Sequence, residues 1–170
     1  MSRLSFINRA SCFLLVFFFL LANIAFSENG VRGNDIFFSD KGPIEITSQK
    51  LQTYNNSNKA IFEGNVIAKQ GQTTLYAQWM QVKYNDDGQV EEIHARGDVK
   101  VVKLDRVITS DEVVYFSKEG KIVFTGSPVA RDKKSTVTGS KMVYYIKDGR
   151  SIVENSRVVL KGKKTKKEDK

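Results

Sequence analysis

Very few residues of this sequence carry side chains that could take part in catalysis or metal binding. The 170 residues contain one histidine, His94, and one cysteine, Cys12. A site with two histidine ligands is therefore excluded, and a Ser–His pair would have to use His94, which falls on an outward position of a predicted strand. The adjacent carboxylates Asp86–Asp87 and Asp111–Glu112 diverge in a turn or strand instead of sharing a proton. The sequence predicts no enzyme, no catalytic residue, no metal site and no cofactor.

The N-terminus has the pattern of a secretory signal peptide. Two arginines precede an apolar run, residues 13–22, and Ala25 and Ser27 provide the small residues of a cleavage site. We expect residues 1–27 to be removed, which leaves a chain without cysteine in an oxidising compartment. The alternative is a retained membrane anchor, although the run is shorter than the roughly 20 apolar residues that a spanning helix needs.

The positive charge of the chain is concentrated at its C-terminus. The formal net charge is +8, and residues 161–170 hold six Lys against one Glu and one Asp, a net +4. Because the rest of the chain after residue 27 is close to neutral, its composition argues against a nucleic-acid groove. We expect the Lys-rich segment to be a disordered, solvated tail.

The region between residues 43 and 160 reads as one β-domain after a flexible lead-in, residues 28–42. Short runs of β-branched and aromatic residues alternate with turn signals at 55–59, 85–88, 118–120 and 147–149. Three of these turn segments end in a glycine that follows an acidic residue. Tight turns between strands favour such steps because glycine accepts positive φ. No stretch has the spacing of a substantial helix.

Two short patterns repeat along this domain in strict alternation. Copies of the first, such as "ITSDEVVYFS", begin at Ile46, Leu75, Ile108 and Val137. Copies of the second, such as "IFEGNVIAK", have their pivots at Gly64, Gly97, Gly126 and Asn155. Glycine and asparagine tolerate left-handed backbone best, so we expect a bend or bulge at each pivot. A further column of small residues, Ser48, Ala77, Ser110 and Gly139, predicts a crowded corner.

Alternation along each predicted strand assigns one apolar face to the interior. In the first pattern this face contains Ile46, Leu75, Ile108, Val137, Leu51, Met80, Val113, Met142, Val82, Tyr115 and Tyr144, with Thr53 in the same column as Val82. In the second pattern it contains Phe62, Val66, Ala68, Ala95, Val99, Val101, Phe124, Ala130, Val153 and Val159. Stacked repeats make continuous apolar walls, as in an elongated antiparallel β-jellyroll or solenoid. Because the side chains differ in size, the walls either close into a core or leave a furrow.

The segment "PIEITSQKLQTYNNSNKAIFEGNVIAKQGQTTLYAQWMQVKY" from Pro43, the turns "FEGNV" and "ARGDV", the signal peptide and the Lys-rich tail resemble the OstA-like family of lipopolysaccharide-transport proteins. The resemblance covers residues 43–160 and implies an open β-jellyroll whose apolar interior receives the acyl chains of lipid A. The implied groove residues are Ile44, Ile46, Leu51, Phe62, Val66, Leu75, Met80, Val82, Val99, Val101, Ile108, Val113, Tyr115, Phe124, Val137, Met142 and Tyr144.

The resemblance also implies a place of action and partners. It implies a Gram-negative periplasm, an LptC-like inner-membrane subunit at the N-terminal edge, an LptD-like outer-membrane translocon at the C-terminal edge, and end-to-end self-association. The expected edge residues are Ile44, Glu45, Ile46 and Thr47 at one end and Val158, Val159 and Leu160 at the other. A competing interpretation is that residues 28–42 and 161–170 cap these edges.

Two further functions remain open from the sequence, a lipid-independent β-scaffold that links membrane complexes and a membrane-anchored LptC-like subunit. The basic residues Lys100, Lys103 and Arg131 are placed near the mouth of the expected furrow, where they could meet lipid phosphates. Their competing role, which the sequence favours, is as solvated charges on the outer face.

Overall fold

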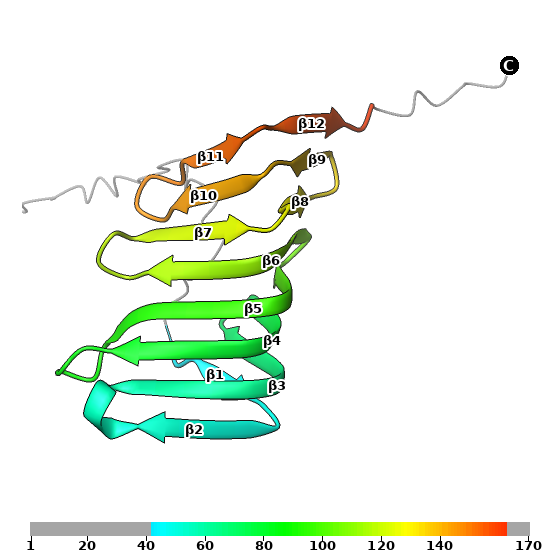
Figure 1. Cartoon of the computed structure of the whole chain (residues 1–170). Coiled ribbons are helices and arrows are strands. Elements are labelled where there is room, and N and C mark those ends of the chain that lie inside the picture. The colour runs from blue at the N-terminus through cyan, green and yellow to red at the C-terminus, as the bar shows by residue number, and fades with distance from the viewer. Residues whose placement is uncertain (1–41, 163–170) are drawn as a thin grey trace, which may run out of the picture. The chain divides into compact units, whose positions relative to one another are not determined.

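The computed structural model describes residues 42–162, and nearly all regular structure in this range is β-strand (Figure 1). The prediction of an all-β fold is therefore confirmed. The exception is a 3-10 turn, η1 (Asn55–Ser57). No helix within residues 42–162 is long and apolar enough to cross a membrane. The predicted signal peptide, nearly all of the lead-in and most of the Lys-rich tail lie outside the described residues.

The strands follow one another with short connections. They are β1 (Glu45–Thr47), β2 (Lys50–Tyr54), β3 (Lys59–Gln70), β4 (Thr73–Tyr84), β5 (Val90–Lys103), β6 (Arg106–Phe116), β7 (Lys121–Thr125), β8 (Val129–Arg131), β9 (Ser135–Thr138), β10 (Lys141–Tyr145), β11 (Ser151–Glu154) and β12 (Arg157–Leu160). The turn signals predicted at 55–59, 85–88, 118–120 and 147–149 all fall between strands or at their ends.

Antiparallel pairing joins the strands into one sheet that is bent into two halves. The four longest strands, β3 to β6, change register near their middle and contribute to both halves. The half that we call the β2–β11 half has the order β2, β3, β4, β5, β6, β7, β10, β11, and the β1–β12 half has the order β1, β3, β4, β5, β6, β8, β9, β12. Strands therefore stack one above another (Figure 1), which is the predicted antiparallel β-jellyroll.

The predicted pivots are the points where the strands bend. Gly64, Gly97, Gly126 and Asn155 all have positive φ, at 77°, 81°, 77° and 50°. At Gly97 a side chain would also meet a neighbour, because an added Cβ would lie 2.9 Å from Gln78 Cβ. Glycine is thus required at this bend for its backbone conformation and for its size.

The bends become strand breaks toward the C-terminus. At the third pivot the strand is interrupted between β7 and β8, because Pro128 follows Gly126 and has no N–H to give to a ladder. Gly139 separates β9 from β10, and an added Cβ there would lie 2.4 Å from Val153 Cγ1. This contact supports the expectation of a crowded corner in the small-residue column.

The last bend differs from the other three, and this corrects one predicted position. The first three pivots are each followed by a second residue with positive φ, whereas Asn155 stands alone. With one left-handed residue fewer, β12 is shifted by one position, so Val158 lies opposite Val137 while Val159 lies opposite Thr136. The prediction that Val159 faces inward is therefore wrong, and Val158 occupies the inner position.

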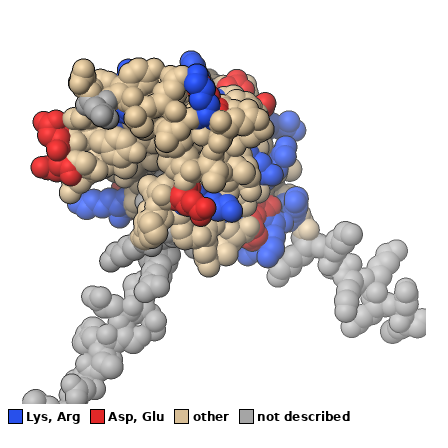
Figure 2. Space-filling view, turned by 90° about the horizontal axis from the view of Figure 1, so that it is seen from below, with Lys and Arg blue, Asp and Glu red and all other residues tan. Residues whose placement is uncertain are grey.

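The stack has an edge strand of each half at both of its ends. Within residues 42–162, β1 and β2 pair only with β3, β11 pairs only with β10, and β12 pairs only with β9. Apolar side chains lie exposed on these edges, among them Leu51, Ile152, Val158 and Leu160. Figure 2 views the stack from below, where β2 lies, and most of that surface is uncharged.

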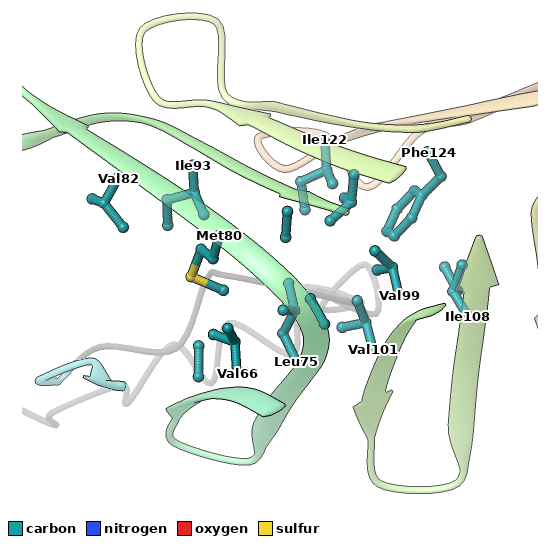
Figure 3. Close-up of a cluster of buried hydrophobic side chains, with 14 of the residues drawn as sticks. Val66, Leu75, Met80, Val82, Ile93, Val99, Val101, Ile108, Ile122 and Phe124 are labelled. Carbon is teal, nitrogen blue, oxygen red and sulfur yellow. The ribbon is translucent and has the colours of Figure 1, made fainter. Parts of the chain in front are cut away.

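The core lies between the two halves of the bent sheet. Its fully buried side chains come from both halves and form one cluster, in which Val66, Leu75, Met80, Val99 and Phe124 have almost no exposed surface (Figure 3). Burying each of these side chains contributes roughly 1.5–3 kcal/mol to folding. The apolar columns predicted from alternation are thus the residues that hold the halves together.

Candidate functional site

Three rows of inward-facing side chains cross the stack from one end to the other. Each row is a chain of directly opposed partners, so it passes through eight strands without a gap. The row of the β1–β12 half is Ile46, Ala68, Leu75, Val101, Ile108, Ala130, Val137 and Val158. The rows of the β2–β11 half are Leu51, Phe62, Met80, Ala95, Val113, Phe124, Met142 and Val153, and Thr53, Ala60, Val82, Ile93, Tyr115, Ile122, Tyr144 and Ser151.

Most predicted groove residues lie on these rows. Val66 and Val99 are buried at the bends beside them, and Ile44 lies just before β1 and is partly exposed. Sequence reasoning missed the column of Ala60, Ile93 and Ile122. These residues lie two positions before Phe62, Ala95 and Phe124, so one more step of the same alternation would have identified them.

Burial along the rows changes with position in the stack. Val82, Val101 and Phe124 in the central strands are at most 2% exposed, whereas Leu51 at one end and Val158 at the other are 53% and 56% exposed. The interior is therefore covered in the middle and accessible toward both ends.

A cleft of about 380 Å³ opens between the two halves near the C-terminal end. Its walls are mainly apolar and come from strands of both halves, with Ile108, Ala130 and Val137 on one side and Met142 and Val153 on the other. Its volume falls in the range of about 300–1,000 Å³ that is typical of small-molecule sites. The polar part of its lining includes Arg106, Arg131, Asp132 and Ser135.

A second cleft, of about 520 Å³, lies at the N-terminal end. Leu51, Tyr54, Phe62 and Tyr84 line it together with the polar turn residues around Asn85. Leu51 and Phe62 belong to an inner row, as Val137 and Val153 do at the other end. Each end of the stack thus gives access to the apolar interior.

The three basic residues predicted near the furrow mouth lie in different places on the sheet. Lys103 lies two positions after Val101 on β5, which places it on the inner face, and it is buried. Lys100 alternates with the inner residue Val101 and lies on the outer face. Arg131 follows the inner residue Ala130 on β8 and also lines the C-terminal cleft. The Nζ atom of Lys100 is 5.8 Å from the ring centre of Tyr76. The expectation of a place at the furrow mouth is wrong for Lys100, whose solvated outer-face role agrees with the structure, whereas Arg131 is among the residues that line the C-terminal cleft.

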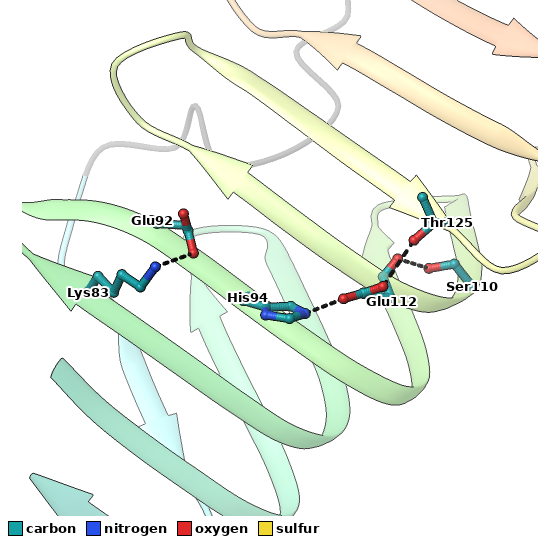
Figure 4. A network of polar contacts seen from close by, with 6 residues as sticks. All are labelled: Lys83, Glu92, His94, Ser110, Glu112 and Thr125. Atoms are coloured by element: carbon teal, nitrogen blue, oxygen red, sulfur yellow. Dashed lines mark hydrogen bonds and ion pairs between the residues drawn. The ribbon is translucent and has the colours of Figure 1, made fainter.

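His94 lies on the outer face, as predicted, in a polar cluster (Figure 4). Its Nε2 contacts Glu112 Oε1, and its ring meets Trp79 edge-on with centroids 5.4 Å apart. Thr125 Oγ1 donates to Glu112 Oε2 at 3.3 Å, and Ser110 Oγ donates to the Glu112 main-chain oxygen at 3.0 Å. Because the Ser110 hydroxyl is directed to a carbonyl and not to His94, the cluster is arranged as a cross-strand tie and not as a Ser–His pair.

No three residues of the described range among His, Cys, Asp and Glu come together as metal ligands. The arrangement that remains is structural and apolar. Two opposed walls enclose a lined interior that is reached from either end. Such a fold defines a class of proteins, the β-jellyrolls with an apolar interior that opens at the ends of the stack.

Comparison with known proteins specifies the family. The model of the family described as "LptA/(LptD N-terminal domain) LPS transport protein" matches residues 45–150, so the chain belongs to this family. The crystal structure of LptH, the LptA homologous periplasmic component of the lipopolysaccharide transport device from Pseudomonas aeruginosa, has the same fold. It matches with a TM-score of 0.62 at 16% identity, over 71% of this chain and 95% of the other.

A curated relative is an uncharacterised protein from Rhizobium meliloti (strain 1021), 40% identical over 70 residues. The match covers 41% of this chain, and the chain spans only 38% of the length of that relative.

Proposed function

We propose that this protein is a periplasmic carrier of lipopolysaccharide that holds the lipid A acyl chains between the two halves of its bent sheet. The observation that supports the proposal most is the continuity of the inner rows, which run through eight strands. The rows of the β2–β11 half reach a cleft at each end. Family membership supports the same conclusion, since the family is one of lipopolysaccharide-transport proteins.

The mechanism we propose is transfer by continuous burial. Each methylene removed from water contributes about 0.8 kcal/mol, so a lipid with several acyl chains is strongly favoured to stay covered. Equivalent inner positions at successive strands let the lipid move with little change in affinity. No step of this movement requires a reaction, so the direction of transport has to come from the partners.

The edges supply the second half of the proposal, a bridge between membranes. Strands with one unpaired side readily take up a further strand. We propose that β1 and β2 meet an LptC-like inner-membrane subunit or the C-terminal end of another copy, and that β11 and β12 meet an LptD-like translocon. Contacts between unlike ends extend into filaments instead of closing, which suits a bridge.

The carrier function is tested by the lipid that accompanies the protein. The full chain is expressed with its own N-terminus, recovered from the periplasm and extracted for mass spectrometry of bound lipid. We expect lipid A-containing species in near-stoichiometric amount, and rebinding after delipidation. A protein that never carries lipopolysaccharide but still associates with both membrane complexes would support the lipid-independent scaffold. A chain that stays membrane-bound from Met1 would support the LptC-like subunit.

A further inference from the structure

Two basic residues lie directly opposite each other on the inner face of the β5–β6 hairpin. Lys103 is the register partner of Arg106, and both alternate onto the same face as Val101 and Ile108. Lys103 is buried and Arg106 is half-buried. Like charges opposed across a strand pair destabilise a sheet, and burying a cation costs more still. A row that served only for packing would carry apolar residues here. Lys103 already has an interaction of its own, so Arg106 is the cation for which an external anion is inferred.

Within residues 42–162, basic residues outnumber acidic ones in the two turns that adjoin Arg106. The two adjoining turns, residues 103–106 and 131–135, contain five basic residues against Asp105 and Asp132. Asp105 pairs with Lys133 at 3.5 Å. Asp132 Oδ1 accepts hydrogen bonds from the amides of Lys134 and Ser135 at 2.7 and 2.6 Å, and these bonds hold its pKa below the usual range. The Arg106 charge also lowers that pKa, with a smaller effect. Five basic residues against two acidic ones leave a formal surplus of positive charge in these two turns, which we call the basic lip.

This basic lip adjoins the apolar wall of the C-terminal cleft. Arg106 lines the cleft together with Ile108, Ala130 and Val137. An amphiphile with a chain in the cleft would therefore carry its polar head past Arg106. Guanidinium groups bind phosphate through paired hydrogen bonds, and an ammonium adds a compact charge.

We propose that Arg106, assisted by Lys103, forms a phosphate subsite at the lip of the C-terminal cleft and binds the phosphorylated head of the acylated ligand. The proposal rests on the carrier function above and names the head-group contact of the same site. Lys103 and its register partner on β4, Thr73, already take part in contacts of their own. Arg106 therefore provides the principal interaction with the phosphate, and Lys103 contributes mainly its charge.

The subsite is tested with the full chain and two lipids that differ only in phosphate. Affinity is measured for diphosphoryl lipid A and for the enzymatically dephosphorylated molecule, with wild type, Arg106→Gln and Arg106→Lys. The matched control is Lys100→Gln, which removes a charge from the outer face of β5, the strand that pairs with the Arg106 strand β6. We expect Arg106→Gln to weaken binding of the phosphorylated lipid about tenfold. The affinity of Arg106→Gln for the dephosphorylated lipid should equal that of the wild type. Arg106→Lys should keep part of the affinity for the phosphorylated lipid, and Lys100→Gln should bind both lipids as the wild type does.

Other outcomes separate the possible failures. Equal losses for both lipids with Arg106→Gln, or no loss for either, overturn the subsite while the carrier function stands. Wild type that binds neither lipid overturns the carrier function itself. Inorganic phosphate at millimolar concentration serves as a third probe. We expect it not to compete, and full competition would show a site for free anions instead of a lipid head group.

Discussion

At the scale of single residues, the bends depend on glycine for two separable reasons. Gly97 and Gly88 have similar φ values, 81° and 75°, but only Gly97 lies against a neighbour, Gln78. A side chain at either position lowers the stability of the fold because it must adopt left-handed backbone. A side chain at position 97 also displaces Gln78. Steric crowding at the bend is therefore distinguishable from backbone conformation by experiment.

We predict that Gly97→Ala destabilises the fold by about 2 kcal/mol or more, whereas Gly88→Ala costs about 1 kcal/mol. Urea denaturation of both variants measures the two free energies of unfolding. Equal costs would show that crowding at Gln78 adds nothing and that the bend needs glycine for its backbone alone.

At the scale of elements, the single left-handed residue of the last bend sets the face that β12 presents. The sequence predicted all four bends because glycine or asparagine marks them, and it predicted the inner columns because alternation holds through the first three. It failed at Val159 because the second left-handed residue, present at Asn65, Asp98 and Ser127, has no counterpart after Asn155. Residue type alone does not reveal that difference.

The sequence did not predict the inward position of Arg106 or the edge positions of β2 and β11, and the reasons differ from that for Val159. Apolar alternation identifies an inward position only where the side chain is apolar, so a cation on the inner face gives no such signal. Pairing on one side only is a property of the assembled sheet, and the residues of β2, such as Leu51, resemble those of central strands. The inner-row residues were predictable, since Leu75, Met80 and Val101 follow the alternation of inward and outward positions.

The register of β12 is tested by disulfide formation in a Cys12→Ser background. We predict that Val137→Cys combined with Val158→Cys forms a disulfide under air oxidation, because directly opposed residues have Cα atoms close enough for one. The pair Val137→Cys with Val159→Cys should remain reduced, since its side chains lie on opposite faces. Electrophoresis without reductant separates the forms, and cross-linking of the second pair alone would restore the uniform repeat.

At the scale of the whole molecule, the described jellyroll combines a covered middle with apolar, half-paired ends. We predict that it self-associates end to end and that Leu160→Lys abolishes this, because a charge on an edge strand blocks strand addition. The matched control is Leu104→Lys at the β5–β6 turn, where the leucine is 71% exposed compared with 76% for Leu160. Sedimentation velocity over a range of concentrations measures association, and equal behaviour of the two variants would contradict edge-to-edge assembly.

The central claim is that lipopolysaccharide travels along the inner rows, and cross-linking from neighbouring positions of one strand tests it most directly. A photoreactive amino acid is placed at Val137, which lines the C-terminal cleft, or at Thr136, the adjacent residue on the outer face of β9. After illumination of transporting cells, we predict lipopolysaccharide adducts from position 137 and none from position 136. Adducts from position 136 with none from 137 would contradict an interior lipid path.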